Sequence, residues 1–147
     1  MNYWIWLATI EGIGPIRKKK LLEKFKIPRK IYAAKEEELL EVEGISKKLL
    51  DNILKSKDIA LIKKYETYIN RNNIRVINIT DHEYPEKLRQ IYDPPITLFC
   101  IGDVSLLNRV SIGIVGSREP SEYGREMAQK FSKELSKKRN CSCKWFG

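Results

Sequence analysis

Three consecutive residues, Gly116, Ser117 and Arg118, offer the chemistry needed to bind a phosphate group. They follow the apolar run 110–115, a predicted buried strand, and precede a predicted helix over residues 121–137. A glycine turn between strand and helix exposes backbone amides that can bind an anionic oxygen. The Ser117 hydroxyl lies beside them, and the planar Arg118 guanidinium can fork onto a phosphate or lie against a base. We therefore predict a phosphodiester site here, with an Arg118–Glu122 ion pair at a plain helix entry as the alternative.

The same loop does not fit the known nucleotide-cofactor motifs. The dinucleotide fingerprint needs three glycines as G-x-G-x-x-G, whereas this chain has Gly116 and then Gly124. The P-loop ends in Gly-Lys-Ser/Thr, which Gly116-Ser117-Arg118 does not match. We therefore expect no nicotinamide or flavin cofactor.

Catalytic and metal-binding sets are also missing from the sequence. His82 is the sole histidine, Glu119 stands alone beside the loop, and no paired carboxylates or nucleophile–base set is found. Cys141-x-Cys143, with Cys100 and His82, could be counted as a zinc site, but structural zinc prefers cysteine pairs two to four residues apart. We expect no catalytic residues and no metal. A nucleotide-processing enzyme stays open as an alternative, because related Rossmann-like folds cleave nucleotide phosphoribosyl bonds.

A second candidate contact with nucleic acid lies near the N-terminus. The sequence Gly12-Ile13-Gly14-Pro15 followed by a basic helix resembles the helix-hairpin-helix motif, in which free amides at a helix N-terminus receive a phosphate. Lysines on that helix add affinity without sequence preference. The predicted DNA-binding residues here are Gly12, Gly14, Arg17, Lys18, Lys19 and Lys20. The alternative for the basic helix is a solvated charged face without a ligand. The alternative function for the whole chain is that of a general helix-hairpin-helix module that binds duplex DNA.

A similar joint recurs at residues 39–49, where Gly44-Ile45-Ser46 replaces the first glycine pair. Ser46 is expected to cap the helix that follows. Five glutamates surround this joint and would repel a DNA backbone, so we expect this hairpin to be mainly structural: Glu36, Glu37, Glu38, Glu41 and Glu43.

The elements that position these residues define an α/β fold class. Residues 1–73 have the apolar spacing of short helices, including a helix over about 57–70 with Ile59, Ile62, Tyr65 and Ile69 on one face. Strands are predicted at 74–79, 97–102 and 110–115, with a short helix starting near Pro85. We therefore predict a helix-hairpin-helix (SAM-like) domain over 1–73 and the first half of a Rossmann-like domain over 74–138.

Composition favours a polyanionic partner. The 147-residue chain has a formal charge of +9 and a pI near 9.5, which suits nucleic acid or an anionic membrane surface. Hydrophobic residues form 42% of the chain, enough for a core. No apolar run approaches the roughly 20 residues of a membrane helix, and the start lacks a basic leader with a cleavage site. We expect a cytoplasmic protein without membrane contact, whose three cysteines need not pair.

Three motifs in order resemble those of the DprA/Smf family of bacterial natural transformation. They are Tyr84-Pro85-x-x-Leu88, Asp93-Pro94-Pro95-x-x-Leu98-Phe99-x-x-Gly102 and Ile114-Val115-Gly116-Ser117-Arg118-x-Pro120-x-x-Tyr123-Gly124. The resemblance covers residues 1–138 and implies a helical hairpin domain followed by an extended Rossmann-like domain. It also implies binding of incoming single-stranded DNA, its delivery to the recombinase RecA in competence and recombination, and a homodimer. In that family the Gly-Ser-Arg loop lies in the DNA groove, which corresponds to Gly116, Ser117 and Arg118.

The resemblance stops near residue 138, where family members continue to a Val-Ser-Gly-Leu-Ala turn. Deleting one adenine from a permitted codon spelling of residues 137–139 restores that motif, so we hypothesise that 139–147 is an out-of-frame tail from a frameshift or a sequencing error. The nucleotide sequence across those codons tests this. The hypothesis predicts that strand 110–115 lacks its neighbour, that the second domain is partly formed and prone to aggregate, and that the dimer and RecA contacts are impaired.

Overall fold

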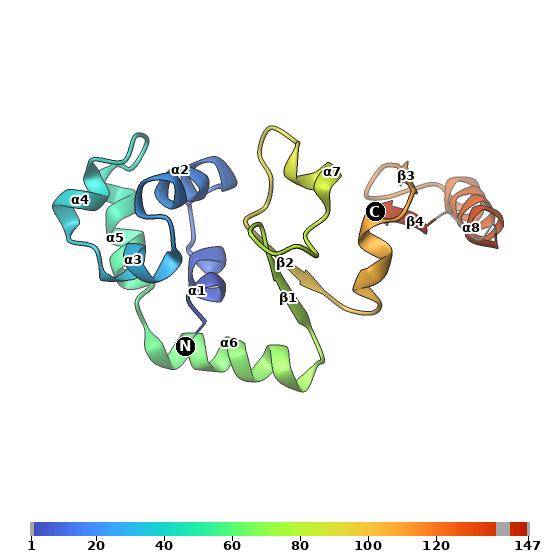
Figure 1. Ribbon diagram of the computed structural model, residues 1–147. Coiled ribbons are helices and arrows are strands. Elements are labelled where there is room, and N and C mark those ends of the chain that lie inside the picture. Colours follow the sequence, from blue (N-terminus) through green and yellow to red (C-terminus); the bar gives the residue numbers. More distant parts are fainter. Residues whose placement is uncertain (1, 138–141, 147) are drawn as a thin grey trace. The chain divides into compact units, whose positions relative to one another are not determined.

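A computed structural model describes residues 2–137 and 142–146 of the chain (Figure 1). The chain divides into two compact units, Met1–Val104 and Ser105–Gly147. A short 3₁₀ helix, Val104–Asn108, spans the boundary. The first unit holds α1 (Tyr3–Thr9), α2 (Pro15–Phe25), α3 (Pro28–Ala33), α4 (Glu36–Leu40), α5 (Lys47–Lys55), α6 (Ile59–Arg71), β1 (Arg75–Asn78), α7 (Glu86–Arg89) and β2 (Thr97–Cys100). The second holds β3 (Ser111–Val115), α8 (Glu122–Lys137) and β4 (Ser142–Phe146).

Local sequence signals account for the ends of the helices in the first unit. The Asn2 side chain accepts hydrogen bonds from the Trp4 and Ile5 amides and begins α1. Pro15 and Pro28 occupy the first turns of α2 and α3, where a missing N–H costs nothing. Ser46 caps α5 by accepting from the Leu49 amide, as its sequence position predicts. The two predicted hairpins therefore form, joined by α3, which the apolar spacing did not predict.

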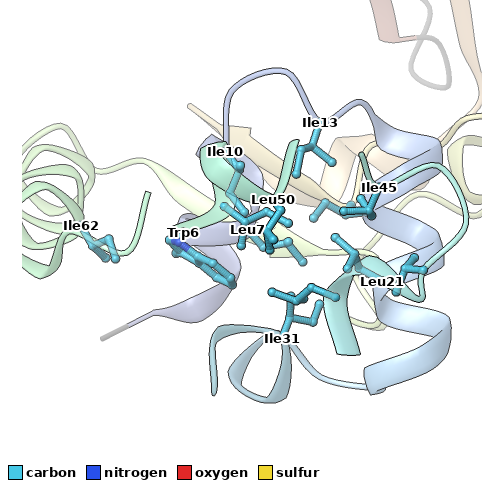
Figure 2. Packing of buried hydrophobic residues seen from close by; sticks show 13 residues of the cluster. Trp6, Leu7, Ile10, Ile13, Leu21, Ile31, Ile45, Leu50 and Ile62 are labelled. Atoms are coloured by element: carbon cyan, nitrogen blue, oxygen red, sulfur yellow. The ribbon is translucent and has the colours of Figure 1, made fainter. Parts of the chain in front are cut away.

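The core of the first unit gathers apolar side chains from every helix of the two hairpins. Trp6 and Leu7 of α1 lie at its centre, both fully buried (Figure 2). The Trp6 indole donates a hydrogen bond to the Ser56 hydroxyl at 2.9 Å, and its ring meets Tyr32 edge-on at 5.0 Å. Figure 2 shows Ile10, Ile13, Leu21, Ile31, Ile45 and Leu50 gathered around the same centre, with Ile62 of the same cluster to one side, beyond Trp6. The hairpins are thus held as one body by a shared core.

Helix α6 buries a narrower face than predicted. Asp58 caps its start by accepting from the Ala60 and Leu61 amides. Ile62 and Ile69 are buried, but Ile59 and Tyr65, predicted on the same face, are 52% and 36% exposed. The main helix contact of α6 is with α1. Only a narrow stripe of the α6 surface is therefore covered.

The first unit extends past the helices to include the first sheet. Strands β1 and β2 pair antiparallel, with Ile77 opposite Leu98. Ile96, directly before β2, is buried within the helical core, and β2 packs on α1. The buried Tyr84 donates a hydrogen bond to the Pro95 carbonyl at 2.6 Å. The compact unit therefore extends to Val104. The domain boundary after residue 73 stays a prediction.

The second unit is a parallel strand–helix–strand element. Strand β4 pairs parallel with β3, Ser111 lying opposite Ser142 and Val115 opposite Phe146, and α8 packs on β4. The expectation that strand 110–115 lacks a neighbour is therefore wrong. Backbone pairing needs only an extended segment that returns after the crossover helix, and Trp145 and Phe146 are residue types favoured in strands. This element is the repeating unit of a Rossmann-like fold, so the predicted α/β class is confirmed at that level.

The prediction that residues 110–115 form a buried strand is also wrong. Val115 is 82% exposed, Val110 61% and Ile112 39%. A parallel strand is buried only when both faces of its sheet are covered. Among the described residues of this unit, α8 is the one long helix and it packs on β4, so side chains of β3 stay open to solvent.

Candidate nucleic-acid interface

The loop that follows β3 presents the predicted phosphate-binding residues to solvent. Gly116, Ser117 and Arg118 are all exposed. The Ser117 hydroxyl donates to the Glu119 carbonyl at 2.9 Å, which holds the loop in a turn. Ser121 then begins α8, its hydroxyl accepting from the Gly124 amide at 3.2 Å. The backbone amides of Ser117 and Arg118 form no hydrogen bond with another described residue, so both donors point to solvent or a ligand.

Gly116 does not adopt the conformation expected of a glycine-dependent turn. The glycines with positive φ are Gly12, Gly44 and Gly102, and Gly116 is not among them. A Cβ added at Gly116 would meet no heavy atom within 4 Å. The backbone angles therefore tolerate other residues, and what the glycine contributes is open space beside the chain. Such space allows a ligand to approach the backbone closely.

Arg118 is not engaged by its neighbours. Across the described residues its guanidinium forms no ion pair, and the Arg118–Glu122 pair of the alternative interpretation is not formed. Its two acidic neighbours, Glu119 and Glu122, are exposed, and Arg125 lies one helical turn further on. The loop thus carries a solvated cation next to free amides, although nearby carboxylates reduce its positive potential.

The first hairpin has the predicted turn. Gly12 has φ +76°, which favours glycine, and a Cβ there would come within 2.9 Å of the Asn52 Nδ2, so the Asn52 side chain would have to shift. Gly14 begins α2 without a side-chain cap, and the amides of Ile16 and Arg17 have no backbone partner among the described residues. These amides face a groove of about 370 Å³ that Arg17, Lys20, Glu43 and Asp93 help to line.

Two of the four α2 cations that the sequence assigned to DNA, Arg17 and Lys20, are bound by the second hairpin, and so is Lys24 further along the helix. The Arg17 Nε donates to the Gly44 carbonyl at 2.9 Å. Lys20 pairs with Glu43 at 2.9 Å, and Lys24 pairs with Glu41 at 2.6 Å. Lys19 is exposed and forms no ion pair with a described residue. The structure therefore brings the basic and acidic hairpins together and leaves Lys19 as the free cation of the predicted group.

Lys18, also predicted to contact DNA, is buried. Its side chain is 8% exposed and its ammonium donates to the Ala8 carbonyl. Burial lowers the pKa of the Lys18 ammonium to about 8. It is not presented to a ligand at the surface. The signal was in the sequence, because Lys18, Leu21 and Phe25 share the helical spacing of a core-facing stripe.

Two residues position the turns, and one of them, Asn52, was not singled out from the sequence. Asn52 donates from Nδ2 to the Glu11 carbonyl at 3.1 Å and holds the first turn from α5. Gly44, with φ +87°, leaves its carbonyl open to Arg17. The recurrence of the Gly-containing joints indicated that the turns would be alike, but only packing shows that each hairpin holds the other's turn.

The described part of the chain offers neither a metal site nor a membrane-spanning helix. No group of three or more His, Cys, Asp or Glu side chains there could hold a metal ion. Cys141, named in the rejected zinc set, lies outside the described residues. Among the helices described, none has both the length and the apolar content to cross a bilayer.

The fold and the loop define a class of protein in which tandem helical hairpins precede a Rossmann-like unit. Residues 7–56 match the family of the SAM-like helix-hairpin-helix tandem, and residues 75–142 match the family described as DNA recombination-mediator protein A. Over residues 75–142 the chain thus resembles the DprA/Smf family. Members of this family are named as DNA-processing or recombination-mediator proteins.

Individual relatives agree with this assignment. Protein Smf of Synechocystis is 28% identical over 141 residues, covering 92% of this chain and 35% of the relative. DNA processing protein DprA of Bacillus subtilis is 44% identical over 66 residues, covering 44% of this chain and 22% of the relative. The X-ray structure of DprA from Streptococcus pneumoniae shares the fold, with a TM-score of 0.62, 23% identity, and coverage of 92% of this chain and 46% of that one. The chain thus spans about a third of the length of the first of these relatives and less than half of the solved structure.

Proposed function

We propose that the chain is a non-enzymatic, cytoplasmic DNA-binding protein that binds single-stranded DNA through the loop Gly116-Ser117-Arg118. The observation that carries the proposal is that this loop offers unused hydrogen-bond donors next to open space. Its guanidinium is unpaired among the described residues, two adjacent amides are free, and Gly116 leaves open space beside them. Resemblance to a DNA-processing family supports DNA as the source of the phosphates.

A phosphodiester chain uses all three features at once. The guanidinium can donate two parallel hydrogen bonds to one phosphate, the amides can donate to a phosphate oxygen, and the absent side chain allows close approach of the sugar. None of these contacts reads a base, so binding is expected to be independent of sequence and to weaken as salt rises. The first hairpin adds attraction through Lys19 and the free amides at the start of α2.

The test compares two arginine variants of the full chain. Arg118→Ala is expected to weaken binding of a fluorescent oligothymidylate about tenfold, the effect of losing one charge-assisted contact of roughly 1.4 kcal/mol. Arg109→Ala removes the same charge from an exposed arginine before β3 and is expected to change affinity much less. Equal affinities for Arg118→Ala and the unaltered chain in anisotropy titrations would rule out the loop as the main contact.

Delivery of the strand to RecA, and a homodimer, are finer parts of the same proposal. They rest on the family resemblance, because the chain spans only part of its relatives. Their test is whether the chain accelerates RecA filament formation on coated single strands, and whether it sediments as a dimer. A monomer that leaves filament formation unchanged would confine the proposal for this chain to DNA binding.

Duplex binding by the helical hairpins is the second candidate function. It is favoured by the match of residues 7–56 to a helix-hairpin-helix tandem and by similarity to UvrABC system protein C of Clostridioides difficile, 51% identical over 47 residues, covering 32% of this chain and 8% of the relative. Against it, Arg17, Lys20 and Lys24 are engaged by the second hairpin. Lys19→Glu should weaken duplex binding under this candidate, while Arg118→Ala should leave it unchanged.

A further inference from the structure

Helix α6 carries a basic and aromatic stripe on the side away from the core. Lys64, Tyr68 and Arg71 recur at the spacing of one helix face, and all three are exposed. Ile62 and Ile69, on the other side of the helix, are buried, and α6 packs on α1 (Figure 1). The Tyr68 side chain is 62% exposed, which leaves a large ring in water between two cations.

The charges on this stripe are not neutralised in the way those of α2 are. Glu66 is the one acidic residue within α6, and its Oε1 accepts a hydrogen bond from the Asn2 amide on the inner side of the helix. Neither Lys64 nor Arg71 forms an ion pair within the described residues. By contrast, Lys20 and Lys24 of α2 are paired with glutamates. The outer side of α6 therefore presents free cations that can accept an anionic partner.

A groove adjoins the stripe. Tyr65 lies one helical turn before Tyr68 and, with Leu61 of α6 and Lys55 of α5, lines a groove of about 220 Å³. This hollow is much larger than one water molecule, and its lining includes the Tyr65 ring, the Lys55 cation and one acidic residue, Glu11. Tyr65 is 36% exposed and so offers part of its ring to an occupant. Two successive tyrosines thus lie side by side, one on the outer face and one at the rim of the groove.

We propose that the outer face of α6 is a second contact for single-stranded DNA, in which Lys64 and Arg71 bind phosphates and a base stacks on Tyr68. The following base would enter the groove beside Tyr65. An unpaired strand fits this arrangement because its base faces are free to stack, whereas those of a duplex are covered by their neighbours. Any base has such a face, so the contact needs no sequence preference. The proposal rests on the proposed single-strand binding but uses a different helix and a different interaction.

The test separates stacking from charge by pairing two ligands with several variants of the full chain. The ligands are an oligothymidylate and an abasic strand of the same length, which keeps the phosphates and lacks the bases. Tyr68→Ala is expected to weaken binding of the oligothymidylate at least about fivefold and to leave binding of the abasic strand unchanged. Tyr68→Phe keeps the ring and should bind like the unaltered chain. Tyr92→Ala, at another tyrosine that is 86% exposed, is the matched control and should have no effect.

Variants of Lys64 and Arg71 test the contribution of charge, as the Tyr68 variants test that of stacking. Lys64→Ala with Arg71→Ala is expected to weaken both ligands and to lower the salt dependence of binding. Unchanged oligothymidylate affinity in Tyr68→Ala, while Arg118→Ala still weakens binding, would overturn the α6 contact and leave the proposed function standing. Failure of the unaltered chain to bind either strand would overturn both. Circular dichroism melting of each variant identifies any loss of affinity that comes from unfolding.

Discussion

The Nε of Arg17 donates a hydrogen bond to the backbone oxygen of Gly44 at 2.9 Å, so the basic helix of the first hairpin holds the turn of the second. Gly44 has φ +87°, and a Cβ there would lie 3.4 Å from that same Nε. The acidic hairpin is therefore the partner of α2 within the chain. This relationship explains how a strongly basic segment and a cluster of glutamates are accommodated in one small body.

Removing this bond should loosen the hairpin pair. Arg17→Ala is expected to lower the free energy of unfolding by about 1 kcal/mol, the usual net value of such a hydrogen bond. Lys19→Ala, at the exposed neighbour without an ion pair to a described residue, should change it by less than about 0.5 kcal/mol. Urea unfolding followed by tryptophan fluorescence measures both. Equal midpoints for the two variants would show that the Arg17–Gly44 bond adds nothing to stability.

The two glycines of the first turn should differ sharply. Gly12→Ala is expected to destabilise the chain by about 1–3 kcal/mol, because the residue has φ +76° and a Cβ would come within 2.9 Å of Asn52. Gly14→Ala meets no atom within 4 Å and should cost well under half as much. Thermal melting compares them. Similar melting temperatures for the two variants would contradict the assignment of a left-handed turn at Gly12.

The buried Lys18 predicts a specific dependence of stability on pH. Its pKa is lowered from 10.5 to about 8 by burial, so between these values the unfolded chain holds a proton that the folded chain has released. Stability contributed by this group therefore rises as pH increases from about 8 to 10.5, and at pH 7 the buried charge costs up to about 3 kcal/mol. Replacing Lys18 by Met should abolish that rise.

The measurement is the free energy of unfolding of Lys18→Met and the unaltered chain at pH 7 and pH 10. The difference between them should shrink as pH rises, because the lysine becomes neutral. Lys19→Met, at an exposed position, serves as the control and should show no such trend. Parallel pH profiles for Lys18→Met and the unaltered chain would indicate that the Lys18 ammonium is not desolvated.

The exposed apolar side chains of the second unit should make the protein prone to self-association. Val110 and Val115 are 61% and 82% exposed, and Phe131 of α8 is 57% exposed. Large apolar side chains exposed in this way promote association. The double variant Val110→Thr with Val115→Thr keeps the strand propensity and is expected to reduce binding of a hydrophobic dye and light scattering. Ile77→Thr, at a position 1% exposed, should instead destabilise the first unit. Dye binding that is unaffected by the double variant would contradict this.

Features set by local sequence could be predicted before the structure. Ser46 caps α5 because a serine at that position satisfies an amide three residues on, whatever surrounds it. The glycine-containing turns and the start of α8 follow similarly from neighbouring residues. The order of the other elements likewise follows from the apolar spacing, but α3 and β4 were not predicted from it.

Features that depend on how the elements pack together could not be predicted from the sequence. The burial of Lys18, the Lys20–Glu43 pair and the Arg17–Gly44 bond depend on how two hairpins meet. The exposure of Val115 depends on what covers a sheet, and the extent of the first unit depends on Ile96 joining the helical core. The candidate loop was predictable as a motif. Only the structure shows that Gly116 has no positive φ and that Arg118 forms no ion pair with a described residue.

The salt dependence of single-strand binding tests the central claim most directly. For the unaltered chain, the logarithm of the association constant should fall linearly with the logarithm of salt concentration. If Arg118 binds one phosphate, Arg118→Ala should reduce that slope by about 0.7, while Arg109→Ala should not. The same slope for Arg118→Ala as for the unaltered chain would show that this guanidinium does not touch the DNA backbone, and the assignment of the loop would fail.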